Sequence, residues 1–235
     1  MPHPLLALTA EFRSLLDFSL CPALAKYRHI RDFQAPDSVI RLRLAGTVHS
    51  RHFRSNAYPI ADLGRLIRGM SPDLLLLEIR PDYGARGWWA DCPADMAYGA
   101  ALADEHGIPV AGFDAWLADH NAREDAMARN LMRIVAERLP YGSALALTGY
   151  SHVFELSARL MADGWTETDV DHAELRALFQ RPAPLLPSTL TGRLRQAADR
   201  ARSAVTPFDG RWADSRDALA DRLDRAAGTR RDRRR

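Results

Sequence analysis

A run of apolar residues from Asp73 to Ile79, DLLLLEI, is the strongest constraint on how this chain can fold. A strand without polar alternation is buried on both faces, which is typical of the centre of a parallel sheet. Further strands are predicted at Ser38–Ala45, Ile108–Phe113, Ser143–Thr148 and Trp165–Val170. Helices are predicted between the strands, at Ile60–Met70, Ala94–His106, Ala118–Leu139 and Val153–Asp163. This alternation predicts βαβ units, and therefore an α/β fold with a mostly parallel sheet flanked by helices.

The pattern divides the 235 residues into three parts. Residues 1–36 are predicted to form an N-terminal helical arm, because Leu5, Leu8 and Phe12 recur at helical spacing. Residues 37–180 carry the alternating pattern and are predicted to form the α/β core domain. Residues 181–235 begin as a proline-rich linker and continue as an Arg-rich helical tail, whose end we expect to be disordered.

Charge is distributed unevenly between the body of the chain and this tail. Residues 181–235 hold 14 Arg and 7 Asp, although the whole chain has a net charge of only +2. Arginines in such number could contact nucleic-acid phosphates. The interleaved aspartates disfavour that interpretation, so we expect a solvated arm or one that packs on a second subunit of a homo-oligomer.

Cysteine content and hydropathy indicate the compartment. The two cysteines, Cys21 and Cys92, are far apart and fit no disulfide framework or zinc-binding spacing, so a reducing compartment is expected. The first ten residues lack the positively charged lead of a signal peptide. No stretch approaches the roughly 18 apolar residues that span a membrane. We therefore expect a soluble cytoplasmic protein without a membrane partner.

Two Gly-x-x-His motifs, Gly46–His49 and Gly149–His152, follow the first and fourth predicted strands of the core. Glu78 lies at the end of the strand DLLLLEI. The carboxyl ends of parallel strands meet at one edge of a sheet, and ligands bind there. In the common doubly wound order, the first strand lies between the second and the fourth, which would bring His49, Glu78 and His152 together. The glycines are expected to let the chain turn sharply off each strand and approach a ligand.

Two imidazoles and one carboxylate suit a catalytic divalent metal with an open position for water, such as Zn, Mn or Co. Without a metal, His49 or His152 could act as a general base on water, with Glu78 orienting the ring. Both alternatives are open from the residues alone.

Other polar or aromatic residues are weaker candidates. His52 could form an alternative H-x-x-H ligand pair with His49, but it lies in a predicted loop. Asp95 and Asp114 are interpreted as structural caps. The adjacent Trp88 and Trp89 could line a substrate pocket or pack on the core.

A series of short motifs recurs in a recognisable order: GTVH (46–49), PDLLLLEIRPD (72–82), DMAYGAALADEHGIPVAGFD (95–114), REDAMARN (123–130) and GYSHVFEL (149–156). This series resembles the Tiki/TraB superfamily, which also includes the erythromycin esterases and the ChaN-like haem-binding proteins. The resemblance implies a site of His49, Glu78, Arg123 and His152. It implies metal-dependent proteolysis, ester hydrolysis or haem binding, according to the branch of the superfamily.

The chain departs from each branch of that superfamily. Thr47 follows Gly46 where the erythromycin esterases carry an acid, and the membrane segments of TraB and Tiki members have no counterpart here. Arg123 could bind a substrate carboxylate or stabilise an oxyanion, or it could be a surface helix residue in an ion pair. We therefore expect a hydrolase of ester, amide or peptide bonds, acting on a small-molecule or peptide substrate as a metal-dependent peptidase or an esterase-like enzyme. The alternative is a non-catalytic protein that binds haem, a metal or a small ligand.

Overall fold

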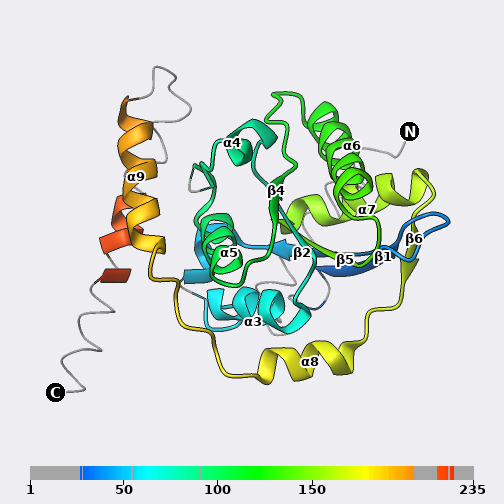
Figure 1. Cartoon of the computed structure of the whole chain (residues 1–235), viewed down its shortest axis with the longest axis horizontal. Helices are drawn as coiled ribbons and strands as arrows, with labels where there is room; N and C mark the ends of the chain where they lie inside the picture. The colour runs from blue at the N-terminus through cyan, green and yellow to red at the C-terminus, as the bar shows by residue number, and fades with distance from the viewer. Residues whose placement is uncertain are drawn as a thin grey trace, which may run out of the picture.

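The computed structural model describes residues 27, 29–53, 55–89, 91–203, 216–221 and 223–224. A mixed, mostly parallel sheet lies between helices (Figure 1), which confirms the predicted α/β class. The strands are β1 (Ile30–Gln34), β2 (Arg41–Thr47), β3 (Leu74–Leu77), β4 (Val110–Gly112), β5 (Ser143–Gly149) and β6 (Thr166–Thr168). The helices are η1 (His49–Phe53), α3 (Ile60–Met70), α4 (Pro81–Ala85), α5 (Ala94–Glu105), α6 (His120–Arg138), α7 (Tyr150–Ala162), α8 (His172–Gln180) and α9 (Leu190–Ser203).

The order of the strands differs from the predicted one. The sheet runs β4-β3-β5-β2-β1-β6, so β5 rather than β2 lies at the centre of the parallel part. The reason is that β1 pairs antiparallel with β2 and occupies one of its two edges. Only one edge of β2 is then left for a parallel neighbour; β5 pairs there and in turn pairs with β3. The strands that precede His49, Glu78 and His152 are still three adjacent strands.

Strand β1 also corrects the predicted N-terminal helical arm. Residues Ile30–Gln34 lie in the sheet, where Arg43 of β2 donates two hydrogen bonds of 2.7 Å to Asp32 of β1. The helical pattern came from residues near the N-terminus, which lie outside the described residues together with most of the arm. The core domain therefore begins before residue 37.

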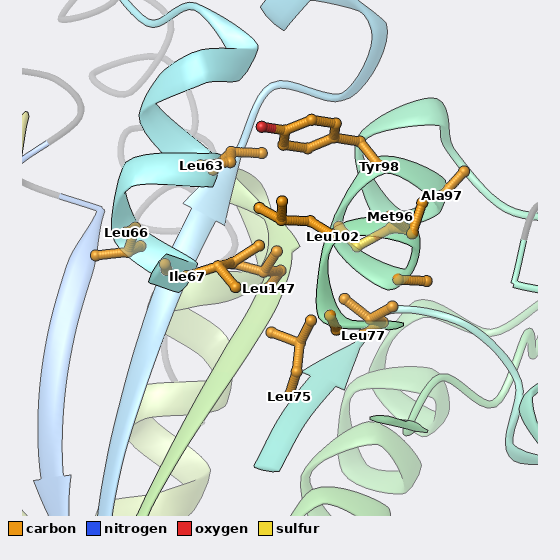
Figure 2. Packing of buried hydrophobic residues seen from close by; sticks show 14 of the residues in the cluster. Leu63, Leu66, Ile67, Leu75, Leu77, Met96, Ala97, Tyr98, Leu102 and Leu147 are labelled. Atoms are coloured by element: carbon orange, nitrogen blue, oxygen red, sulfur yellow. The ribbon is translucent and has the colours of Figure 1, made fainter. Parts of the chain in front are cut away.

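The hydrophobic core has two parts because successive residues of a strand point to opposite faces of the sheet. Leu75 and Leu77 of β3 face α3 and α5, where they pack with Leu63, Met96 and their neighbours (Figure 2). The alternate leucines of β3, at positions 74 and 76, face α6 and α7 in a second cluster. The continuous apolar run thus serves two helical layers, as the sequence predicted.

The C-terminal part packs on the core through α9. Leu190, Leu194 and Ala197 are fully buried and join the cluster of α3 and α5, and Figure 1 shows α9 (orange) beside α5. A helical tail was predicted after the proline-rich linker, and α9 lies there. Helix α8, which precedes the linker, was not predicted. Among the described helices, none is long and apolar enough to cross a membrane.

Candidate active site

Glu78, at the end of β3, forms the centre of a polar cluster at the carboxyl edge of the sheet. Its Oε2 accepts hydrogen bonds from the Thr148 hydroxyl at 2.9 Å and from the Gly149 N–H at 2.5 Å. Its Oε1 accepts one from Arg123 Nη2 at 3.0 Å and lies 3.6 Å from His152 Nε2. Gly149 immediately precedes α7, where a helix N-terminus favours a negative charge. The carboxylate is therefore held by donors from β5, α6 and α7.

His49 lies at the start of η1 and pairs with Asp95 in the first turn of α5. Its Nδ1 is 3.4 Å from both oxygens of Asp95, whose side chain is fully buried. The backbone of His49 has a φ of +49°, a strained conformation for a residue with a side chain. Strain of this kind is often found at functional sites, where the surrounding structure holds a side chain in position. The Asp95 contact leaves Nε2 as the ring nitrogen that can meet a ligand.

His152 forms a second pair, with Glu124 of α6. Its Nδ1 donates a short hydrogen bond to Glu124 Oε1, and both side chains are almost entirely buried. His152 is the third residue of α7, which begins at Tyr150 rather than at the predicted Val153. Its Nε2 faces Glu78. Each predicted histidine therefore has a carboxylate on Nδ1, which fixes the ring orientation and leaves Nε2 to act.

Arg123 lies between two buried carboxylates. Its Nε and Nη2 donate to Asp114 at 2.8 and 2.7 Å, and Nη2 also donates to Glu78. Asp114 in addition accepts hydrogen bonds from the N–H groups of Ala115 and Trp116 in the loop after β4. It was predicted to be a cap, but the residue that caps α6 is Asp119. Among the described residues, Nη1 of Arg123 has no hydrogen-bond partner and remains a donor for a ligand.

These contacts change the charge of both histidines. Burial on its own lowers the pKa of His49, but the charge and the hydrogen bond of Asp95 outweigh it and raise the pKa to about 9. Burial likewise lowers the pKa of His152, and Glu124 and Glu78 together raise it above its ordinary value. The pKa of Asp95 falls to about 2 despite burial, because His49 lies beside it. At neutral pH the ring of His49 therefore carries a proton on each nitrogen in the ligand-free protein, and the protonated form of His152 is favoured.

The other sequence candidates have structural roles. His52 accepts the Val48 N–H at Nε2 and contacts the Tyr58 carbonyl through Nδ1, so neither nitrogen is left for a metal. Trp89 packs closely against Gly84, and Trp88 lies edge-on to the ring of Tyr83. Because both ring nitrogens of His52 are occupied, the alternative H-x-x-H ligand pair of His49 and His52 is wrong.

The glycines of the two motifs were expected to make sharp turns, and that reason is wrong, since neither has a positive φ. Both glycines are instead needed because a side chain at either position would overlap neighbouring atoms. A β-carbon at Gly149 would lie 2.8 Å from His49 Nε2 and 3.3 Å from Cδ2 of His152. A β-carbon at Gly46 would lie 2.7 Å from the Cβ of His29 and 3.0 Å from the Cα of Tyr150. Gly149 thus leaves space between the two imidazoles, whereas Gly46 lets β2 approach the start of α7.

We expect alanine at these two positions to give opposite results. Gly149→Ala should fold with nearly unchanged stability, because the His49 ring can rotate away, and the pKa of His49 should fall as its contact with Asp95 is lost. Gly46→Ala should lower the free energy of unfolding by about 1–3 kcal/mol, because the Cβ of His29 and the Cα of Tyr150 cannot move away from the added methyl group without a shift of the backbone. Urea denaturation and an NMR titration of the histidines measure both effects. Equal destabilisation by the two changes would contradict this division.

The predicted metal ligands do not fit a metal as they are placed. Both oxygens of Glu78 accept hydrogen bonds from the chain's own donors, and the guanidinium of Arg123 lies 3.0 Å from one of them. A fixed positive charge at that distance disfavours a divalent cation. Within the described residues, no group of three or more His, Cys, Asp or Glu side chains is arranged to hold one. A bound Zn, Mn or Co stays a prediction, which elemental analysis of the purified protein tests.

Comparisons of the chain with protein-family models, with curated proteins and with solved structures found no match. The Tiki/TraB resemblance therefore stays a prediction, and the candidate site rests on the geometry of its own residues.

Sequence reasoning found one member of each pair and missed the other. Asp95 was interpreted as a cap, and Glu124 was considered only as a surface partner of Arg123. The signal that could have found them is their position. In βαβ units a helix that follows a strand begins at the carboxyl edge of the sheet, so residues in the first two turns of α5 and α6 lie beside the strand ends.

Proposed function

We propose that this protein is a hydrolase of ester or related acyl bonds, with His49 as general base and Asp95 as the residue that orients it. The observation that carries the proposal is the buried Asp95 carboxylate on Nδ1 of a strained His49, whose Nε2 lies beside Gly149. A histidine oriented in this way by a carboxylate acts as a base through Nε2, and the carboxylate stabilises the imidazolium that forms.

The remaining residues suit the other steps of acyl transfer to water. Neutral His49 takes a proton from water, whose oxygen attacks the carbonyl carbon of the substrate. The carbonyl oxygen becomes an oxyanion, which Nη1 of Arg123 stabilises by donating to it. His152 donates its Nε2 proton to the leaving group and regains one from the carboxylic acid product. His49, whose side chain is 38% exposed, returns its proton to water.

The raised pKa of His49 determines how hydrolysis should vary with pH. A general base must be neutral, and the neutral fraction of His49 grows until the pH passes about 9. We expect kcat/KM for a chromogenic ester to rise with pH as His49 loses its proton, and to fall again where His152, the proton donor, loses its own. In Asp95→Asn the carboxylate that raises the pKa of His49 is gone, so the rise should occur at lower pH and reach a lower maximum.

The measurement is a pH–rate profile of both proteins on p-nitrophenyl esters of short acids. NMR titration of His49 in the same two proteins serves as the control, since the two pKa values should agree. A profile that does not move in Asp95→Asn, while the NMR titration does, would show that another group is the base.

The charge of the two histidines favours a second candidate function, the non-catalytic binding of a small anionic ligand. Imidazolium groups donate hydrogen bonds to carboxylates or phosphates, and such binding weakens as the pH rises through about 9. This is opposite to the direction expected of hydrolysis. Anion binding measured by calorimetry at pH 7 and 10, with no turnover on esters or peptides, would favour it. A haem Soret band would favour the haem-binding alternative.

A further inference from the structure

We propose that Arg200, on the C-terminal helix α9, is a positioning residue for the His49–Asp95 pair, and that the tail thereby belongs to the site. The inference rests on the proposed function for its biological meaning. Its geometry stands on contacts between α9 and residues 86–89 and 91–93, which we call the α5 entry loop.

Arg200 contacts the α5 entry loop at two points. Its Nε and Nη2 lie 3.1 and 3.4 Å from the two oxygens of Asp91, and its guanidinium lies over the ring of Trp88 at 5.4 Å. The Asp91 side chain is only 10% exposed, so the pair is shielded from water on that side. An arginine suits this position because its planar group can pair with a carboxylate and stack on an indole at once.

The α5 entry loop leads directly into the turn that carries Asp95. Asp91 donates its N–H to the carbonyl of Trp88, and Cys92 donates its thiol to the carbonyl of Trp89, so the loop is internally tied. Asp95, four positions after Asp91 in the sequence, is fully buried at the start of α5. A displacement of Asp91 is therefore transmitted to the end of α5 that faces His49.

A second line of contacts runs from Arg200 towards Arg123. The ring of Trp88 lies edge-on to Tyr83 at 5.5 Å, and Tyr83 lies edge-on to Trp116 at 5.3 Å. The Trp116 N–H donates to Asp114, the carboxylate that anchors Arg123. The α9 helix thus supports both sides of the candidate site, although it touches neither histidine.

The other contacts of α9 explain why Arg200 can be tested separately from docking. Leu194, Ala197 and their buried neighbours hold α9 on α5 by apolar packing, which does not require Arg200. Arg195 lies five residues earlier on α9, and within the described part of the chain its ion-pair partners are Asp221 and Asp224 of the tail. Because these described contacts are away from the α5 entry loop, and Arg195 has the same charge and helix as Arg200, it is a matched control.

The experiment is an NMR titration of His49 in the full-length chain carrying Arg200→Gln or Arg195→Gln. We expect the pKa of His49 to fall in Arg200→Gln, because Asp95 is held less firmly and burial alone lowers that pKa. Arg195→Gln should leave the pKa as it is in the unchanged protein. Asp91→Asn removes the same ion pair from the loop side and should reproduce the fall, which covers the case in which Arg200→Gln does not fold.

An unchanged pKa of His49 in Arg200→Gln and Asp91→Asn would overturn the proposal, and so would an equal fall in Arg195→Gln. The titration needs no substrate, so it is independent of the proposed reaction. If no ester or peptide is hydrolysed, the hydrolase proposal fails while the role of Arg200 is still decided by the titration.

Discussion

Replacing His49 by glutamine should lower kcat for ester hydrolysis by about 10²–10⁴-fold, the range over which a positioned acid–base group contributes to a rate. Glutamine retains a polar side chain of similar length but cannot take a proton from water. The fold should survive, because His49 is 38% exposed at the side chain and lies in a short 3-10 turn outside the sheet. The measurement is kcat with p-nitrophenyl esters, together with thermal unfolding of both proteins.

His106→Gln is the matched control for this change. His106 is exposed and follows the C-terminus of α5, the helix whose opposite end carries Asp95. It should leave kcat and the unfolding temperature unaltered. If His49→Gln retained activity within a few-fold of the unchanged protein, His49 would not be the base, and the site would have to act through His152 alone.

The positions of most core elements could be predicted because their patterns are local. The helix over Ile60–Met70 was predicted with the bounds it has, and the strand over Ser143–Thr148 was short by one residue. The apolar run of β3 indicated a strand with helices on both faces, and two helical layers cover it. Periodicity and apolar runs report on burial, which is why they predicted these elements well.

The strand order and strand β1 could not be predicted in the same way. Ile30–Gln34 contains two buried residues and three polar ones, too few to distinguish a strand from the end of a helix. Its pairing with β2 depends on contacts between separate segments of the chain, so no local sequence pattern predicts it. Because β1 pairs with one edge of β2, β5 rather than β2 lies at the centre of the parallel part of the sheet. Gly149, at the end of β5, therefore lies between the two imidazoles, and Gly46 does not.

The candidate site was half predictable for a related reason. Residues at strand ends stand out in the sequence, so His49, Glu78 and His152 were found, and the structure brings them to one edge. Their carboxylate partners Asp95 and Glu124 lie inside helices, where an acidic residue is ordinarily solvated. Only the burial of both side chains reveals that they serve the histidines.

Removing the guanidinium of Arg123 should have the largest effect on stability of any single change at the site. Arg123→Met leaves the buried carboxylates of Glu78 and Asp114 without their counter-charge. Breaking a buried ion pair from one side costs about 3–5 kcal/mol, because an unpaired charge remains in a poorly solvated place. Urea denaturation at pH 7 measures the loss.

The matched control is Arg133→Met on the same helix. Arg133 pairs with Glu137 one turn away, and both side chains are more than half exposed. Exposed pairs of this kind contribute about 0.3–0.5 kcal/mol, so the control should be close to neutral. Equal small losses in the two variants would support the surface interpretation of Arg123.

A double variant separates a lost counter-charge from lost packing. Adding Asp114→Asn to Arg123→Met removes one of the two carboxylates left without a counter-charge, so it should recover part of the loss at pH 7. A packing defect would not be recovered in this way. Recovery would show that the positive charge of Arg123, rather than its packing, stabilises the carboxyl edge of the sheet. The same charge would interact with an oxyanion or a substrate carboxylate bound there.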